Sequence, residues 1–347
     1  MDIIRFHEVK ALNIGILTYY FANNYGAVLQ CYALQEYLEK EYGANVSVIT
    51  YNPPRMNSYR SRISGYIRNH KQYTAFEDFR KRYLHLSNSK EYDLVLVGSD
   101  QVWNPSINGF DDAWISPHLS YKGIASYAAS LGKEEFDQRE RQYLEKNKDA
   151  LKAYKGISVR EKDGQTILGD LEIKSNKVCD PVFLLSMCMN KYDSLKSQSK
   201  INIEDEYILV YSLEHNPRID EVSQRIKRET GMKVVSIHPA NAQTQVCDAF
   251  ISDSGPCDFL RLIQDASLVV TNSFHGLAFS LLFKKKCYSI FHSSGLSSRQ
   301  MELCRYFCGN LKQTEEDMFV LDNFEYDKQL NALNAEARVF LDSIMNL

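Results

Sequence analysis

A histidine at the start of a predicted helix is the strongest candidate for chemistry in this sequence. The apolar, β-branched run 267–272 predicts a strand, and a helix is expected to open at Gly276. His275 lies between them, and an imidazole can donate or accept a proton near neutral pH. Asn272 and Ser273 are residue types that cap helices, and the N–H groups of a helix start attract anions. This turn therefore predicts an anion site with an acid–base group, the alternative being a histidine that only closes the helix start.

Arg160 ends another predicted strand, GISVRE at 156–161. A guanidinium offers a planar fork of N–H groups that fits a carboxylate or a phosphate. Ligands of open α/β sheets bind beyond the carboxyl ends of the strands, so Arg160 and His275 are expected at one edge. The alternative for Arg160 is a structural ion pair with Glu161 or another acid.

Two aspartates also follow predicted strands. Asp100 ends DLVLVGSD at 93–100 and is followed by Trp103 in a short polar loop, a pairing of carboxylate and aromatic ring that suits sugar hydroxyls. Asp180 follows a short strand within KVCDPVFLL at 177–185. The alternative for both is a turn-forming aspartate whose side chain caps its own backbone.

The Asn-rich loop TYYFANNYGA, which contains Asn24, follows the first predicted strand and faces the same edge. It lacks the GxGxxG and GxxxxGK[ST] patterns, which argues against NAD enzymes and P-loop NTPases. HExxH and GxSxG are absent, and the eight histidines show no metal-ligand spacing. We therefore expect no metal and no cofactor.

The elements that position these residues alternate between strand-like and helix-like segments. Strands are predicted at 13–18, 47–50, 93–100, 122–130 and 156–161, and again at 207–213, 233–238, 267–272 and 287–291. Helical spacing between them, for example over 218–230, indicates βαβ units with right-handed connections. Two successive α/β series, each with a parallel sheet, follow from this alternation.

The length of 347 residues also suggests about two domains. We place an N-terminal Rossmann-like domain over 1–190 and a C-terminal one over 205–320, with a polar linker at 186–205. A final helix over 321–347 is expected to pack back on the N-terminal domain.

Composition excludes several classes of function. Acids number 44 and bases 41, so a generally basic nucleic-acid binder is not expected and nucleic acid is not a predicted partner. The start lacks a signal-peptide apolar region, and no apolar run reaches the roughly 18 residues that span a bilayer. With no CxxC among eight cysteines, the expectation is a cytoplasmic protein with free thiols. The 22 tyrosines suit a carbohydrate site without proving one.

One segment departs from this balance. Arg55–Arg82 contains eight bases against two acids, a net charge of +6, with tyrosines interleaved. Such a patch fits phosphates or an anionic membrane surface, so peripheral contact with the inner membrane face is a further expectation. The alternative is a solvated helical face.

Together these segments resemble the polysaccharide pyruvyl transferase family. The resemblance runs in order through GILTYYFANNYGAVLQCYALQ, VGSDQVWNP, ASYAAS, ISVRE, CDPVFLL and LVVTNSFHGLAFSLL, from about residue 13 to about 310. GSDQVWN and SFHGLAFSL are the more specific motifs. The resemblance implies a GT-B-like fold in which two Rossmann-like domains face each other across a cleft. The N-terminal domain would then be the acceptor side and the C-terminal domain the donor side.

The resemblance implies roles by position. His275 matches the family histidine that is implied to be the general acid, and Arg160 the arginine implied to bind the donor's anionic groups. Asp100 and Asp180 match acidic positions implied to orient or activate acceptor hydroxyls. Many members have an arginine where this chain has Ser273, and Arg299 is our candidate replacement.

Other residues expected to contact substrate stand beside these in the same motifs: Asn24, Trp103, Asn272, Ser273 and Gly276. The implied reaction moves pyruvate from phosphoenolpyruvate, a donor substrate and not a cofactor, to two hydroxyls of a saccharide. The basic segment suggests a lipid-diphosphate-linked acceptor. The alternatives are a nucleotide-sugar glycosyltransferase of GT-B type and a non-catalytic saccharide-binding protein.

Overall fold

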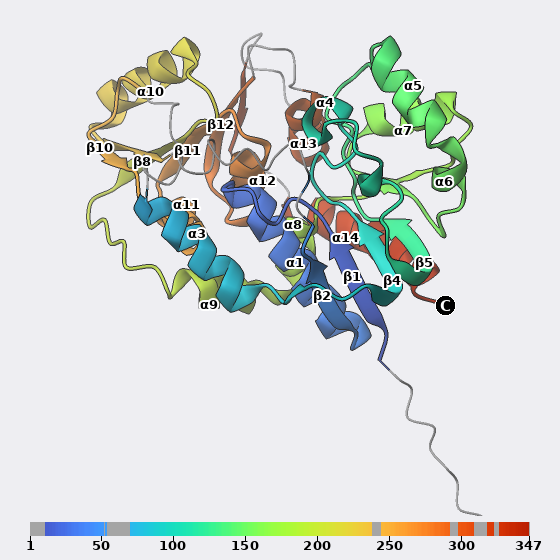
Figure 1. Ribbon diagram of the computed structural model, residues 1–347. Helices are drawn as coiled ribbons and strands as arrows, with labels where there is room; N and C mark the ends of the chain where they lie inside the picture. The colour runs from blue at the N-terminus through green and yellow to red at the C-terminus, as the bar shows by residue number, and fades with distance from the viewer. Residues whose placement is uncertain are drawn as a thin grey trace, which may run out of the picture.

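The computed structural model describes residues 11–51, 53, 70–237, 244–291, 298–308, 318–322 and 326–346. The first part of the chain forms a five-stranded parallel sheet in the order β3-β2-β1-β4-β5 (Figure 1). Its strands are β1 (Asn13–Leu17), β2 (Asn45–Ile49), β3 (Leu86–Ser87), β4 (Glu91–Val97) and β5 (Ser120–Ser126). The two central strands, β1 and β4, are almost entirely buried, as expected for a parallel sheet covered on both faces.

Helix α1 (Tyr25–Tyr42) connects β1 to β2 and packs between this sheet and the second part of the molecule. The Asn24 side chain caps its start, and Gly43 ends it in the left-handed conformation with φ 59°. Most of its residues are buried, because the helix packs against both its own sheet and helices of the second half. Residues 25–35 are buried without interruption, so the first three turns of α1 lie inside the molecule on every side.

The second part forms a six-stranded sheet in the order β10-β9-β8-β11-β12-β13. These strands are β8 (Tyr207–Tyr211), β9 (Lys233–Ile237), β10 (Ala249–Ile251), β11 (Leu268–Thr271), β12 (Lys286–Ile290) and β13 (Met318–Leu321). All pair in parallel except β13, which runs antiparallel to β12 at the edge. The accompanying helices are α10 (Pro217–Thr230), α11 (Pro256–Asp265), α12 (Phe274–Leu282) and α13 (Ser298–Cys308).

Shorter elements complete the first part. The helices are α3 (His70–Tyr83), α4 (Pro105–Asn108), α5 (Gln138–Lys146), α6 (Lys148–Lys152) and α7 (Lys162–Asp170), with a 3-10 turn at Asp112–Trp114. A two-stranded parallel sheet, β6 (Ser158–Val159) with β7 (Asn176–Lys177), continues the edge of the main sheet, because Ala129 bridges to both Asp100 and Val159.

The predicted linker is not a plain polar segment. The chain passes through α8 (Pro181–Leu184), a 3-10 turn (Leu185–Cys188) and α9 (Met189–Lys196) before it enters β8. Tyr192 and Leu195 of α9 are buried, and the Tyr192 hydroxyl donates to the carbonyl of Val182 at 3.0 Å. Its few apolar residues pack on α11, which a weak sequence pattern did not reveal.

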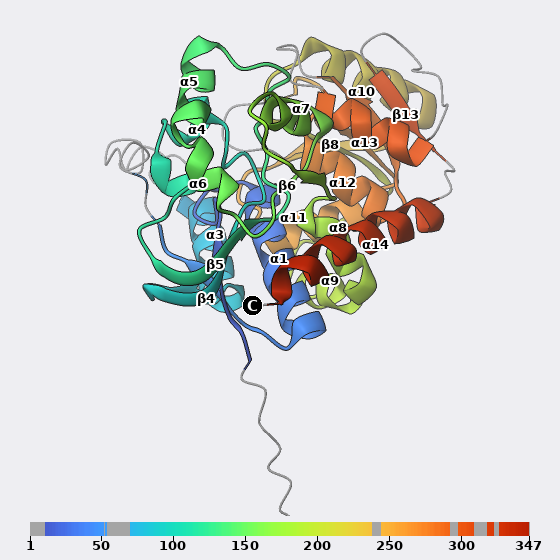
Figure 2. The same ribbon diagram turned by 90° about the vertical axis from the view of Figure 1, so that its right-hand side faces the viewer.

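One hydrophobic core extends through both sheets. Tyr25 of α1 stacks on Phe259 of α11 with ring centroids 4.6 Å apart, and its hydroxyl contacts Ser254. The last helix, α14 (Tyr326–Met345), returns to the first part (Figure 2). There Phe340 packs near Tyr127, and the hydroxyl of Tyr42 donates to Asp342 at 2.8 Å.

The basic segment Arg55–Arg82 lies partly outside the described residues, which resume at His70. In α3 the Arg80 side chain is buried and donates both terminal nitrogens to Asn23 Oδ1, so it is not part of a solvated face. Among the described residues, no helix is long and apolar enough to cross a membrane. The same residues contain no group of three or more His, Cys, Asp or Glu side chains placed to hold a metal ion.

Candidate active site

A cavity of about 160 Å³ lies where the strand ends of the two halves meet. Most of the residues expected at a substrate site line it. From the first half come Asn24, Asp100, Gln101 and Arg160, and from the second Leu213, Asn272, Ser273, Phe274, His275, Arg299 and Gln300. The structure therefore brings together residues that are as much as 276 positions apart between Asn24 and Gln300.

Helix α12 begins two residues earlier than its sequence suggested. Ser273 is the N-cap, and its Oγ accepts the N–H of Gly276 at 3.3 Å. The N–H groups of Phe274 and His275, at the first turn, have no partner within the helix. Gly276 does not line the cavity, which corrects the expectation that it contacts substrate. A Cβ at Gly276 would lie 2.3 Å from Thr271 Oγ1, so glycine is required there by close packing.

His275 is held between two neighbours. Its Nε2 lies 3.5 Å from the Asp180 carboxylate, and the residue is 8% exposed. On the other edge of the ring, a Cβ at Gly26 would lie 2.0 Å from Nδ1. The imidazole thus occupies the space that the missing side chain of Gly26 leaves at the start of α1, and this contact fixes its orientation.

Asp180 has a different position from the one expected. It is fully buried, its Oδ1 accepts the N–H of Val182 as the N-cap of α8, and its Oδ2 accepts Arg160 Nη1 at 2.7 Å. Burial acts to raise the pKa of this carboxyl, but His275 and Arg160 outweigh it and hold the pKa well below its usual range. Asp180 lines not the cavity of His275 but a smaller one of about 50 Å³ beside Arg160, and its carboxylate contacts both His275 and Arg160. At 1% exposure it is not placed to contact an acceptor hydroxyl in the larger cavity, where it was expected.

Arg160 joins the two halves of the site. Besides its bond to Asp180, its guanidinium lies 4.5 Å from the centroid of the Phe274 ring, and its Nε lies 3.7 Å from Glu161 Oε2. The expected alternative, an ion pair with Glu161, is thus present together with a place in the cavity. Burial acts to lower the pKa of Arg160, but Asp180 and Glu161 raise it overall, so the guanidinium stays charged.

Arg299 lines the same cavity from α13. Burial, and next the charge of Arg160, lower its pKa. Two guanidinium groups that repel each other across one cavity favour an anion bound between them. Arg299 and Ser273 line the same cavity, and the replacement of the family arginine by Arg299 stays a prediction.

Asn272 and Asn24 contribute polar groups at the two helix starts. Asn272 is 2% exposed, and its Oδ1 accepts the N–H of Leu213 at 2.8 Å. Its Nδ2 is buried and has no hydrogen-bond partner among the described residues, which leaves a donor for a ligand. Asn24 Oδ1 caps α1 by accepting the N–H of Ala27 at 3.2 Å.

Asp100 and Trp103 separate in the structure. Asp100 is half-buried at the cavity, with φ 71° and its Oδ1 accepting the N–H of Gln101 at 2.8 Å. Trp103 is buried in the core of the first half, where its Nε1 donates to the carbonyl of Trp114 at 3.0 Å. The expectation that Trp103 contacts substrate is therefore corrected: the ring fills the core beneath the loop.

Four cavity residues were not anticipated from the sequence: Gln101, Leu213, Phe274 and Gln300. Gln101 and Phe274 lie inside the two most specific motifs, and Leu213 closes a predicted strand, so their positions gave a signal. Gln300 lies on α13, for which the sequence analysis predicted no helix.

Comparison with known structures shows the fold. The UDP-N-acetylglucosamine 2-epimerase from Rickettsia bellii is 10% identical, with a TM-score of 0.50 over 97% of this chain and 96% of that chain. The UDP-GlcNAc 2-epimerase from Neisseria meningitidis, bound to UDP-GlcNAc, is 9% identical with a TM-score of 0.47 over 96% and 100%. The architecture is GT-B-like, as the resemblance implied. No curated protein sequence matches this chain.

A sequence model of a protein family also matches this chain. The sequence model described as polysaccharide pyruvyl transferase matches residues 24–294, which include Asn24, Asp100, Arg160 and His275. The match covers most of the chain and both halves of the cavity. The chain therefore belongs to the polysaccharide pyruvyl transferase family.

Proposed function

We propose that this protein transfers pyruvate from phosphoenolpyruvate to two hydroxyls of a saccharide and forms a cyclic ketal. The observation that carries the proposal is the placement of His275 beside two arginines and a helix start in one cavity. An acid–base group and a concentrated positive charge are what an enol phosphate donor requires. Asp100 on the opposite wall adds a carboxylate that faces the same space.

Donor binding uses the wall formed by the start of α12, by Arg299 of α13 and by Arg160, which the first half contributes. The N–H groups that begin α12 and the Nδ2 of Asn272 are oriented donors for one anionic group. Arg160 and Arg299 supply charge for the other. We assign this wall to phosphoenolpyruvate, whose carboxylate and phosphate need two such sets.

The reaction begins with proton transfer from His275 to the methylene carbon of the donor. The adjacent C2 then becomes cation-like, and the first sugar hydroxyl adds there while Asp100 accepts its proton. The C2–O bond to phosphate breaks, and the second hydroxyl closes the ring as its proton passes to the departing phosphate. Asp180 keeps the imidazole oriented throughout. The enclosed cavity limits hydrolysis by water.

The acceptor side is the first half, and we propose a lipid-diphosphate-linked saccharide at the inner membrane face. The support is the positive charge of Arg55–Arg82 in the sequence, leaving aside the buried Arg80. Purified protein is expected to bind anionic vesicles at low salt and to release them as salt is raised. Absence of binding at low salt would remove the membrane part and leave the transfer reaction untouched.

The decisive experiment combines mass spectrometry with phosphate release. Candidate saccharides incubated with the protein and phosphoenolpyruvate should gain about 70 Da, the mass of pyruvate less water at the cation-like centre. His275→Gln should lower the rate of phosphate release by about 10²- to 10⁴-fold. The exposed His85 provides the control, His85→Gln, which should retain the activity.

Ligand-dependent thermal shifts separate this proposal from its competitors. Stabilisation by phosphoenolpyruvate is expected, whereas stabilisation by a nucleoside diphosphate alone would indicate glycosyl transfer. A protein that binds the saccharide but never releases phosphate would be a binding protein. Full phosphate release by His275→Gln with a working acceptor would remove the histidine from its role as general acid.

A further inference from the structure

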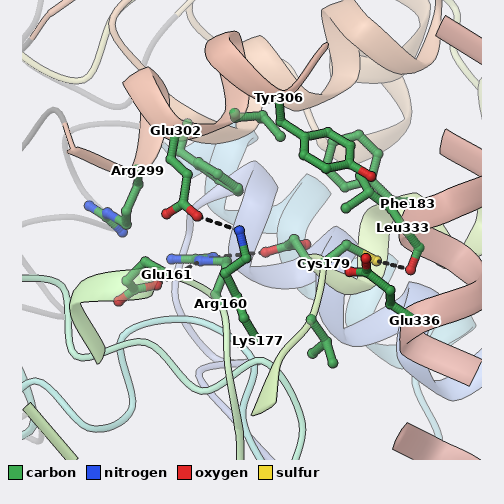
Figure 3. Close-up of a pocket in the computed structure, with 14 residues that line it drawn as sticks. Arg160, Glu161, Lys177, Cys179, Phe183, Arg299, Glu302, Tyr306, Leu333 and Glu336 are labelled. Carbon is green, nitrogen blue, oxygen red and sulfur yellow. Dashed lines mark hydrogen bonds and ion pairs between the residues drawn. The ribbon is translucent and has the colours of Figure 1, made fainter. Parts of the chain in front are cut away.

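Helix α13 carries two charged side chains, Arg299 and Glu302, that contact different parts of the molecule. Arg299 lines the cavity of His275, and Glu302, one turn later on α13, points toward Lys177 of the first half (Figure 3). Both also line a smaller cavity of about 50 Å³ on the other side of Arg160. The geometry of Glu302 therefore bears directly on where Arg299 lies.

Glu302 makes two bonds, and both cross from the second half to the first. Its Oε1 pairs with Lys177 Nζ on β7 (Figure 3). Its Oε2 accepts the N–H of Lys162 at 3.2 Å. Lys162 begins α7, so the carboxylate also lies at the positive end of a helix. Glu161, the residue that precedes α7, does not cap it with its side chain, so Glu302 serves as an acceptor at this helix start.

These contacts tie α13 to the element that carries the other arginine. Arg160 directly follows β6, β6 pairs with β7, and Lys177 closes β7. Glu302 therefore links α13, which carries Arg299, to β7 and through β6 to Arg160. The Glu302 and Lys177 side chains are 32% and 34% exposed, so the tie is formed at the rim and not in the core.

Arg299 needs to be held in place because its positive charge is repelled by that of Arg160. Arg160 is fixed by Asp180, while burial and the charge of Arg160 disfavour the charged form of Arg299 where it lies. The carboxylates of Glu161, Asp100 and Asp180 attract Arg299, but burial and the charge of Arg160 outweigh them. Arg299 would therefore gain solvation by turning away from the cavity. Within the described residues the Arg299 guanidinium forms no hydrogen bond or ion pair, so its place depends on the helix that carries it.

We propose that Glu302 is a positioning residue that holds Arg299 toward the donor anion by tying α13 to Lys162 and Lys177. The inference rests on the proposed function, in which Arg299 binds phosphoenolpyruvate. Its effect belongs to donor binding: the KM for phosphoenolpyruvate should rise, whereas kcat at saturation and the KM for the saccharide should stay near those of the wild type.

Three variants separate the ion pair of Glu302 with Lys177 from its hydrogen bond to the Lys162 N–H. Glu302→Ala removes both bonds and should raise the KM for phosphoenolpyruvate about fivefold, while Glu302→Gln keeps an acceptor for the Lys162 N–H and should raise it about twofold. Lys177→Met removes only the ion pair and should resemble Glu302→Gln. The control is Asp322→Asn, which breaks the pair of Asp322 with Lys286 at a comparable exposure and should leave the KM unchanged.

A double-mutant cycle with Arg299→Gln decides the matter. If Glu302 acts through Arg299, Glu302→Ala should have no further effect on the KM for phosphoenolpyruvate once Arg299 is replaced. An equal rise in both backgrounds, or a wild-type KM in Glu302→Ala, would overturn the positioning role. Equilibrium titration with phosphoenolpyruvate should repeat the same pattern in its Kd.

Failure of the proposed function gives a different result. If the wild-type protein shows no binding of phosphoenolpyruvate in that titration, the donor assignment itself is wrong. If the wild type binds and Arg299→Gln binds about tenfold more weakly, the donor site stands, and the Glu302 variants then test the tie alone.

Discussion

Helices α1 and α12 start at the same cavity from opposite halves of the chain, and their first residues follow the same order of types. A polar cap, Asn24 or Ser273, accepts a backbone N–H three residues later, and an aromatic residue follows it. At the next position α1 has Gly26 and α12 has His275, whose ring lies against that glycine. One helix start thus provides the reacting group, and the other provides the space that orients it.

The two starts also differ in how tightly their surroundings are fixed. Around α12, His275, Asn272 and the nearby Asp180 are all buried, and Asp180 holds Arg160 as well. On the α1 side the cavity wall is formed by the half-buried Asn24, Asp100 and Gln101. Under the proposed division of roles, the buried groups around the start of α12 would hold a small donor, and the half-buried residues beside α1 would face a larger acceptor.

Asp180→Asn should have the largest effect, because it changes the buried surroundings of the α12 start. The change removes one charge from a fully buried group of ions and should cost about 3–5 kcal/mol of stability near neutral pH. The pKa of Asp180 is lowered by folding, so its contribution is complete above about pH 5, the region where unfolded aspartate is ionised. It is lost as the pH falls below about 4 toward the folded-state pKa.

Thermal unfolding of both proteins from pH 7 to pH 3 measures this effect. The gap in Tm between wild type and variant should be largest at neutral pH and should narrow in acid. Asp193→Asn is the control, because Asp193 is exposed and pairs with Lys196 in the same helix, so the Tm of this variant should follow the wild type. A gap that stays constant with pH would show that Asp180 does not stabilise the site as an ionised group.

Gly26→Ala tests the shape that α1 provides. The new Cβ would coincide with the imidazole of His275, so the ring must move and the rate of phosphate release should fall about 100-fold. Gly169→Ala in α7 is the matched control, because nothing lies within 4 Å of its Cβ position. It should retain activity and gain slightly in stability. Wild-type activity in Gly26→Ala would show that the space at Gly26 is not needed to orient His275.

Trp103→Phe has the smallest expected effect and tests the corrected position of this residue. It removes one buried hydrogen bond to the Trp114 carbonyl and should cost about 1–2 kcal/mol in urea unfolding. The KM for the saccharide should not change, because the ring does not line the cavity. A tenfold rise in that KM would restore Trp103 to the acceptor site.

The sequence predicted well those features that depend on local pattern. The β11–α12 turn was located to within two residues, because an apolar strand, a capping serine and a helical run each leave a signal in adjacent positions. Arg160, Asp100 and His275 were expected at one sheet edge because parallel strands place their carboxyl ends together.

The remaining features depend on contacts between distant segments. The burial of Asp180 follows from Arg160 and His275 closing over it, and nothing near position 180 indicates that. Trp103 follows a polar turn in sequence but turns into a core formed with Trp114 and Tyr154. Helix α9 was hidden because its apolar residues are few and meet a partner, α11, about 65 residues later.

The return of α14 to the first half has a consequence for how the chain is made. Phe340 and Ile344 close the core beside Tyr127 and Gly156, and the carbonyl of Leu333 accepts the Cys179 thiol. During vectorial synthesis the first sheet emerges from the ribosome long before residues 326–345 exist. Its apolar face therefore waits uncovered while the entire second sheet is translated, and the nascent first half is the stage at which a chaperone would have most to protect.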